Sequence, residues 1–240
     1  MRTLEQITKI KQSIESPYSI KNFISEQEIT HLINLYDTID DCPDGHELKI
    51  KKNTGPVTLN IKILLNDKVL SSVIERLKVI IGDFEITAGL FFKTDYPHII
   101  HNDDTFELPD TVYKAITIPL KAYGDNVLKY PDLCFFDQFY FQGPAKFFKN
   151  ESHIDTFYNK QVYNYSEIDG IVDFPFDNNL YLKHFTHLKP QWLDGLSYHS
   201  SLEWKPGNAL IFDSTRLHCA SDFRKLGIKS KLGISIFTKK

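Results

Sequence analysis

Apolar residues recur with a helical spacing in the first third of the chain. One stripe at positions i, i+3, i+4 and i+7 follows the capping-box pattern Ser25-Glu-Gln-Glu28 and consists of Ile29, Leu32, Ile33 and Tyr36. A second stripe spans about residues 67–81 and consists of Leu70, Val73, Ile74 and Leu77. Both stripes predict amphipathic helices. Between them, apolar and polar residues alternate over residues 57–63, which predicts a strand.

From Phe84 onward the apolar residues follow the period of two that is typical of strands. This alternation predicts strands over residues 84–92, 112–120, 133–140, 146–148, 209–212 and 232–238. Residues 150–201 instead mix Asn, Asp, His and Tyr with short apolar pieces and follow neither period. Helices followed by many short strands are typical of a β barrel or sandwich that N-terminal helices support.

Length and hydrophobic content fit one domain. The 240 residues, of which 42% are hydrophobic, are enough for one sizeable core. We therefore expect a single, mainly β domain over residues 1–240. Residues 1–83 would form N-terminal helical and strand support, and residues 84–240 the β core, with an insertion at about residues 150–201.

Charge and cysteine usage restrict the partners and the compartment. The formal net charge is −3, so no basic surface argues for a nucleic-acid partner. The three cysteines include no Cys-x-x-Cys pair, which argues against a zinc site or a disulfide framework. The N-terminus lacks the apolar core of a signal peptide, and the longest apolar runs are far shorter than a membrane span. These features predict a soluble, cytoplasmic protein.

A His-x-Asp pair occurs twice, as His101-Asn-Asp103 and as His153-Ile-Asp155. Residues two apart in a strand point to the same side, so either pair can present an imidazole and a carboxylate to one metal ion. A third ligand must come from another segment, and His218 at the end of a late strand is placed for that. Two histidines and one carboxylate leave three open positions on an octahedral metal, as a non-haem iron oxygenase requires.

The tract around His218 favours the first pair. The run Trp204-Lys-Pro-Gly-Asn-Ala-Leu-Ile-Phe-Asp213 places a Pro-Gly turn before a strand, and His218 follows it. Lys229 and Lys231 open the next strand and share one of its faces. Taken alone, the histidine can be an ordinary core residue, and the lysines can be solvated strand-edge residues. Their combination indicates a metal site with a cation nearby.

These segments, in this order, resemble the Fe(II)- and 2-oxoglutarate-dependent oxygenase superfamily, of the kind related to prolyl hydroxylases and phytanoyl-CoA hydroxylases. The resemblance spans most of residues 19–238, and its specific parts are the two metal segments, residues 96–103 and 204–218. It implies a double-stranded β-helix, or jelly roll, with a metal at one open end. It also implies O2 and 2-oxoglutarate as co-substrates and Fe(II) held by His101, Asp103 and His218.

The resemblance further implies a basic residue beyond the distal histidine that pairs with the far carboxylate of 2-oxoglutarate. Lys229 and Lys231 both fit, and we favour Lys231 because it directly precedes the apolar strand over residues 232–237. Many relatives carry arginine there, and a lysine loses the bidentate geometry of a guanidinium. The long separation of Asp103 and His218 departs from compact relatives and fits an insertion between them.

Alternatives remain for both the site and the function. His153 and Asp155 would have a comfortable spacing to His218, but would displace the predicted strands over residues 84–120 from their matching places. The expected function is a dioxygenase that hydroxylates a C–H bond of a small-molecule substrate and releases succinate and CO2. The other functions are a non-catalytic jelly roll that binds a metal or a sugar, and a metal-dependent isomerase or hydrolase. The sequence does not identify the substrate.

Overall fold

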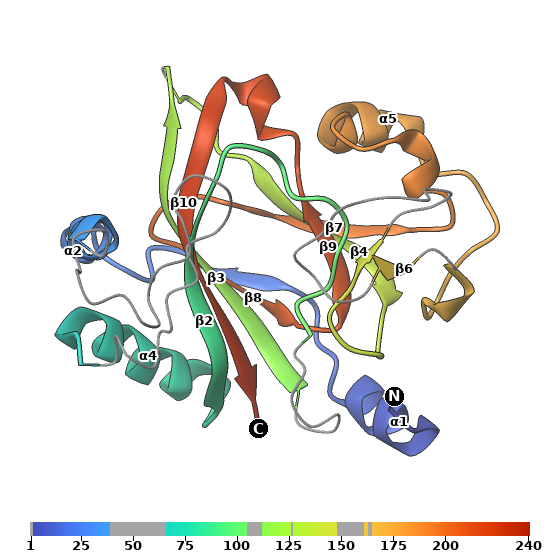
Figure 1. Cartoon of the computed structure of the whole chain (residues 1–240), viewed down its shortest axis with the longest axis horizontal. Helices are drawn as coiled ribbons and strands as arrows, with labels where there is room; N and C mark the ends of the chain where they lie inside the picture. Colours follow the sequence, from blue (N-terminus) through green and yellow to red (C-terminus); the bar gives the residue numbers. More distant parts are fainter. Residues whose placement is uncertain (1, 39–65, 105–111, 126, 148–160, 163–164) are drawn as a thin grey trace.

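The computed structural model describes residues 2–38, 66–104, 112–125, 127–147, 161–162 and 165–240 (Figure 1). Within these ranges the N-terminal part contains the helices α1 (Leu4–Gln12), α2 (Glu26–Thr38) and α4 (Lys68–Ile81) and the strand β1 (Tyr18–Ile20). The later strands are β2 (Glu85–Thr94), β3 (Val112–Gly124), β4 (Asp132–Phe139), β5 (Lys146–Phe147), β6 (Gln161–Val162), β7 (Tyr198–Glu203), β8 (Ala209–Asp213), β9 (Arg216–Ala220) and β10 (Ile228–Lys239). Short helical turns complete the fold: η2 (Tyr165–Glu167), α5 (Asn178–Leu180), η3 (Tyr181–Phe185), η4 (Pro190–Trp192) and η5 (Phe223–Leu226).

The strands form two antiparallel sheets that pack against each other (Figure 1). The first has the order β1-β8-β3-β10-β2 and the second the order β7-β4-β9, while β5 and β6 form a short parallel pair. Side chains of both sheets meet between them, among them Phe135 of β4 and Phe212 of β8, whose ring centroids are 5.0 Å apart. Successive strands such as β3 and β4 lie in different sheets, as in a jelly roll. The predicted double-stranded β-helix is confirmed.

The side chains of β10 alternate between two environments, as a period of two requires. Leu232 and Ile234 are fully buried in the apolar layer that also contains the core residues of α2 and α4. Lys231 and Ser235 face the other way and line a cavity between the two sheets. The strands predicted from Phe84 onward are present in the structure, and β10 begins earlier than predicted. The strand predicted over residues 57–63 lies outside the described residues.

Both predicted N-terminal helices are present and pack on one face of the five-stranded sheet (Figure 1). Ser25 and Glu28 form the expected capping box: the Ser25 N–H donates to Glu28 Oε2 at 2.8 Å, and the Glu28 N–H donates to Ser25 Oγ at 3.3 Å. The Asp67 carboxylate caps α4 by accepting from the N–H groups of Val69 and Leu70. Within the described ranges, no helix is both long and apolar enough to cross a membrane.

The other face of the three-stranded sheet is covered by residues that follow neither period in the sequence. The short turns η3 and η4 and the residue after them place Phe185, Trp192 and Leu193 in one cluster with Cys134 and Phe136 of β4. The strand β7, which the sequence did not predict, pairs with β4. Residues 148–160 and 163–164 lie outside the described ranges, so the insertion at about residues 150–201 stays a prediction. The rival pair His153 and Asp155 also lies outside the described residues.

Candidate metal centre

The segment that follows β2 carries two candidate ligands and lies against β9, which carries the third. His101 and His218 exchange two backbone hydrogen bonds, with N···O distances of 3.0 and 2.9 Å. The N–H of Asp103 donates to the carbonyl of Ser214 at 2.8 Å. His218 lies in the middle of β9 and not, as the sequence indicated, at the end of the preceding strand. The backbone thus brings together side chains that are far apart along the chain.

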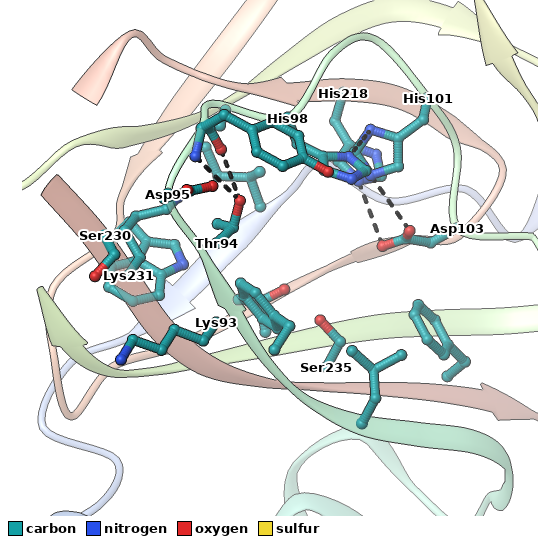
Figure 2. A pocket seen from close by; sticks show the side chains of 18 of the residues that line it. Lys93, Thr94, Asp95, His98, His101, Asp103, His218, Ser230, Lys231 and Ser235 are labelled. Carbon is teal, nitrogen blue, oxygen red and sulfur yellow. Dashed lines mark hydrogen bonds and ion pairs between the residues drawn. The ribbon is translucent and has the colours of Figure 1, made fainter. Parts of the chain in front are cut away.

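The three side chains converge at the cavity (Figure 2). One donor atom from each of His101, Asp103 and His218 lies within 4.8 Å of the others. Oδ1 of Asp103 lies 3.5 Å from Nε2 of His101, and Oδ2 of Asp103 lies 3.3 Å from Nε2 of His218. Ligand atoms about 2.1 Å from one metal and at right angles to each other are about 3.0 Å apart. The donors are therefore spaced like neighbouring ligands of one metal ion.

The second ring nitrogen of each histidine is fixed by a backbone carbonyl. Nδ1 of His101 lies 2.7 Å from the carbonyl oxygen of Ile99, and Nδ1 of His218 lies 3.0 Å from that of Arg216. A carbonyl can only accept a hydrogen bond, so Nδ1 carries the proton and Nε2 keeps its lone pair. Both rings are therefore held in the tautomer that can bind a metal through Nε2.

Burial and neighbouring groups determine the protonation of the site. Burial, and after it the proximity of His218 and His98, holds the pKa of His101 well below its usual value. Burial alone would raise the pKa of Asp103, but His218 and His101 together lower it below its usual value. The structure thus favours a neutral imidazole and an ionised carboxylate, which are the forms in which these groups bind metals.

The cavity has a volume of about 600 Å³ and contains one buried lysine in its wall. The side chain of Lys231 is 4% exposed, and its Nζ lies 4.7 Å from the ring centroid of Trp204 and 5.0 Å from that of Phe223. Among the described residues no carboxylate forms an ion pair with it, and burial lowers its pKa to about 7. An anion in the cavity would supply the missing partner.

The second candidate lysine has a different environment. The side chain of Lys229 is 69% exposed, and its Nζ lies 2.7 Å from the Asp125 carboxylate. The register of β10 against β3 shifts between Ile228 and Ser230, so the strand is irregular where Lys229 lies. Lys229 and Lys231 both line the cavity, but only Lys231 is buried there.

Three further cavity residues were not singled out by the sequence. Thr117 of β3 and Ser235 of β10 are direct partners in the sheet register. They are polar residues at inward positions of largely apolar strands, a signal that the alternation contained. His98 lies three residues before His101, and its ring centroid is 4.5 Å from that of His101. Its position beside a His-x-Asp pair was the available signal.

Comparisons with known proteins bear on the fold. No family model matches the sequence, and no curated protein matches it significantly. Among solved structures, the carbocyclase SnoK of nogalamycin biosynthesis, a non-haem enzyme that depends on α-ketoglutarate (2-oxoglutarate), aligns with a TM-score of 0.51. The alignment covers 100% of this chain and 84% of SnoK at 12% identity. The chain has the fold of the 2-oxoglutarate-dependent oxygenases.

Two other structures with this fold align with lower scores. The α-ketoglutarate-dependent epimerase SnoN, also of nogalamycin biosynthesis, has a TM-score of 0.49 at 11% identity, covering 99% of this chain and 83% of SnoN. A prolyl-4-hydroxylase of Pseudomonas putida has a TM-score of 0.46 at 10% identity, covering 100% of this chain and 94% of the hydroxylase. At these scores neither alignment adds to what SnoK establishes, which is the oxygenase fold.

Proposed function

We propose that this protein is an Fe(II)- and 2-oxoglutarate-dependent oxygenase in which His101, Asp103 and His218 bind Fe(II) and Lys231 binds 2-oxoglutarate. The observation that carries this proposal is one cavity with two contrasting ends: three metal donors at one and a buried cation without a carboxylate partner at the other. A 2-oxo dicarboxylate has matching ends, since its 2-oxo acid group chelates metals and its far carboxylate is an anion.

The residues present fit Fe(II). Two imidazole nitrogens and one carboxylate form the ligand set of non-haem Fe(II) oxygenases, which leaves open positions for other ligands. His101 and His218 offer Nε2 because backbone carbonyls hold Nδ1. When bound, Fe(II) would supply the activation of O2 that is coupled to oxidative decarboxylation of 2-oxoglutarate to succinate and CO2.

Other residues of the cavity would bind and orient 2-oxoglutarate and shield it from water. Lys231 balances one negative charge, and the rings of Trp204 and Phe223 beside it keep water away, which strengthens the ion pair. A lysine is a point charge, so the geometry that a guanidinium would impose must come from other groups. Thr117 and Ser235, which line the same cavity, can donate hydrogen bonds to the same anion.

The substrate is a small molecule in this proposal, and hydroxylation of one of its C–H bonds is the reaction that we propose. The cavity wall includes Leu90, Phe92 and Phe237, so an apolar portion of the substrate is compatible with it. SnoK is a carbocyclase, so an enzyme with this fold can also catalyse a reaction other than hydroxylation.

The test is an anaerobic titration of the apoprotein with Fe(II) and then 2-oxoglutarate. A visible charge-transfer band of the chelated 2-oxo acid is expected in the wild type and should be lost in His101→Ala and His218→Ala. His199→Ala is the matched control, because His199 pairs with Asp137 and does not line the cavity. An iron-loaded protein without the band would favour a metal-binding jelly roll without oxygenase activity. Turnover in the absence of O2 would favour an isomerase or hydrolase.

A further inference from the structure

The four residues of the metal segment, 101–104, alternate between two sides of the chain. His101 and Asp103 line the cavity, whereas Asn102 and Asp104 are only 4% and 5% exposed and do not line it. Side chains on alternate positions of an extended segment point in opposite directions. One side of this segment therefore offers the metal donors, and the other is available to hold the segment in place.

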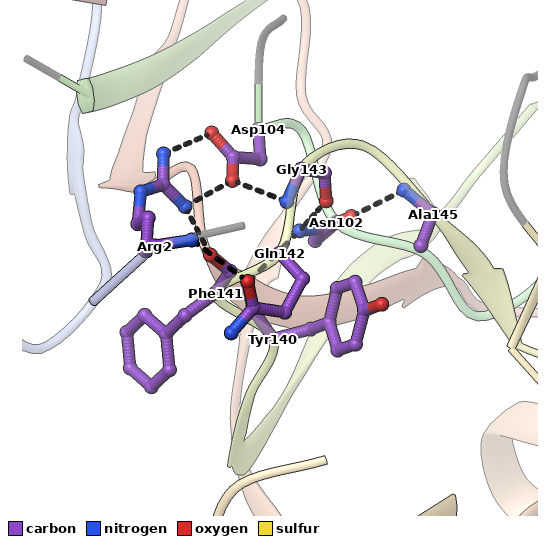
Figure 3. Close-up of polar contacts among 8 residues, drawn as sticks. All are labelled: Arg2, Asn102, Asp104, Tyr140, Phe141, Gln142, Gly143 and Ala145. Atoms are coloured by element: carbon purple, nitrogen blue, oxygen red, sulfur yellow. Dashed lines mark hydrogen bonds and ion pairs between the residues drawn. The ribbon is translucent and has the colours of Figure 1, made fainter. Parts of the chain in front are cut away.

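Asn102 fastens the segment to residues 140–145, which follow β4 (Figure 3). Its Nδ2 donates to the carbonyls of Tyr140 and Gly143, both at 3.1 Å, and its Oδ1 accepts from the N–H of Ala145 at 2.7 Å. Its own N–H donates to the Ala145 carbonyl at 3.2 Å. Asn102 thus fixes the backbone between the first and second metal ligands.

Asp104 is held by Arg2, which lies about a hundred positions earlier in the sequence (Figure 3). Both Nη atoms of the guanidinium donate to the two carboxylate oxygens, Nη2 at 2.9 Å. Nη1 also donates to the carbonyl of Phe141 at 2.7 Å. The two side chains are 3% and 0% exposed. A bidentate pair of this kind fixes the orientation of the carboxylate as well as its distance.

Arg2 is in turn held at the start of α1. Thr3 and Gln6 form a capping box, in which the Thr3 N–H donates to Gln6 Oε1 at 2.8 Å and the Gln6 N–H donates to Thr3 Oγ1 at 3.3 Å. The N–H of Arg2 donates to Gln142 Oε1 at 2.9 Å. The N-terminal segment therefore reaches the metal segment in a defined orientation.

We propose that Arg2 is a positioning residue of the metal centre. By holding Asp104 it fixes the backbone that carries Asp103, so the N-terminal segment tunes the metal affinity of the site. The inference rests on the proposed function, because it concerns the same three ligands. Its physical reason is adjacency: without Arg2 the Asp104 carboxylate keeps the hydrogen bond from the Gly143 N–H at 3.2 Å but loses its bidentate partner, and a backbone shift at Asp104 also moves the neighbouring Asp103. Metal sites tolerate errors of only about 0.2 Å in ligand distance.

A purely electrostatic role of Arg2 would have the opposite effect on metal affinity. Removal of Arg2 takes away a positive charge and leaves the negative charge of Asp104 beside the ligand Asp103. By Coulomb's law alone, a metal cation would then bind more tightly. A positioning role makes it bind more weakly, so the sign of the change separates the two.

The experiment is a titration of the full-length apoprotein with Co(II), with the dissociation constant and the visible d–d spectrum as readouts and no turnover involved. Arg2→Met should weaken Co(II) binding by on the order of tenfold or more and alter the spectrum. Arg2→Lys, which keeps the charge but loses the bidentate geometry, should show a smaller loss. The matched control is Lys11→Met, because Lys11 lies in α1, the helix that follows Arg2, and pairs with Asp169 instead of Asp104. It should bind Co(II) like the wild type.

Circular dichroism tests whether each variant is folded. If Arg2→Met does not fold, the Co(II) affinity of Arg2→Lys is compared with that of the control Lys11→Met instead. Unchanged or tighter Co(II) binding in the folded Arg2 variants would overturn the inference. A wild type that binds no Co(II) would overturn both the inference and the metal site of the proposed function. Co(II) binding, without the charge-transfer band of 2-oxoglutarate in the Fe(II) form, would contradict the proposed function but not the positioning role of Arg2.

Discussion

Two lysines in the described part of the chain, Lys114 and Lys231, are buried in opposite circumstances. The side chain of Lys114, in β3, is 2% exposed, and its Nζ lies 3.0 Å from Asp213 and 2.9 Å from Glu15. Burial would lower its pKa, but these carboxylates outweigh burial and raise it. Lys231, in β10, is similarly buried but has no carboxylate partner among the described residues, and burial lowers its pKa to about 7.

The difference distinguishes Lys114, which is paired within the protein, from Lys231, which we propose binds a ligand. A buried charge is tolerated when it is paired, so the surroundings of Lys114 are complete within the protein. The anion that we propose in the cavity would supply Lys231 with such a partner. Burial by itself is therefore a poor sign of function, and a missing partner beside a cavity is a better one. Four measurements test this difference between the two lysines.

The largest effect is expected from the paired lysine. Lys114→Met should lower the free energy of unfolding by about 3–5 kcal/mol, because it leaves the buried Asp213 carboxylate without its cation. Urea denaturation measures this loss. Lys78→Met, which removes an exposed pair with Glu75, should cost less than about 1 kcal/mol and serves as control. If both variants lose the same small amount, Lys114 is not the structural cation that its contacts indicate.

The unpaired lysine should affect ligand binding instead. Lys231→Met should weaken 2-oxoglutarate binding on the order of 100-fold, or roughly 2.7 kcal/mol, without destabilising the apoprotein. Anaerobic titration of the Fe(II) form measures the affinity. Lys229→Met is the matched control, since Lys229 is on the same strand but exposed and paired with Asp125. Equal losses in the two variants, or a loss confined to Lys229→Met, would reverse our choice of lysine.

The wall beside Lys231 should be sensitive to one added methyl group. A Cβ on Gly233 would lie 3.0 Å from Cζ2 of Trp204 and 3.1 Å from the Ile118 carbonyl oxygen. Gly233→Ala should therefore cost about 1–3 kcal/mol of stability and displace the Trp204 ring on which Lys231 rests. Thermal unfolding and 2-oxoglutarate titration are the measurements. Wild-type values for both would mean that the wall yields without cost.

The last measurement is the pH dependence of stability. The pKa of Lys231 is about 7 in the folded protein, against 10.5 for an unburied lysine, so between these values the unfolded chain binds more protons. The free energy of unfolding should therefore rise with pH in this window, by up to about 1.4 kcal/mol per pH unit. Urea denaturation of the wild type and of Lys231→Met at several pH values isolates this slope. Parallel curves for the two proteins would show that Lys231 does not titrate in this window.

Several features of the fold and of the candidate site could be predicted from the sequence, because local rules determine them. The period of two in residues 232–238 predicted a strand, and the same alternation placed Lys231 on the face opposite Leu232. The capping signal at Ser25 predicted the start of α2. The His-x-Asp spacing named the two ligands that the structure brings next to His218. In each case the signal lies within a few neighbouring residues.

The remaining features depend on contacts that no local pattern encodes. The difference in exposure between Lys229 and Lys231 depends on how β10 is covered, and the register shift beside Lys229 arises in the pairing of β10 with β3. The turns η3 and η4 are too short to show a period, so the cover of the three-stranded sheet was not predicted. The pair of Arg2 and Asp104 joins residues about a hundred positions apart, and neither residue carries a motif.

The backbone pair of His101 and His218 also has a kinetic consequence. It joins residues more than a hundred positions apart, so it closes a long loop, and contacts of such long range are slow to form. Until that loop closes, the two imidazoles do not meet, and the chain presents no complete site to a metal. A bound metal should therefore leave the refolding rate almost unchanged and slow the unfolding rate instead. The metal ion would therefore bind after the chain has folded, and its loss would shorten the lifetime of the native state.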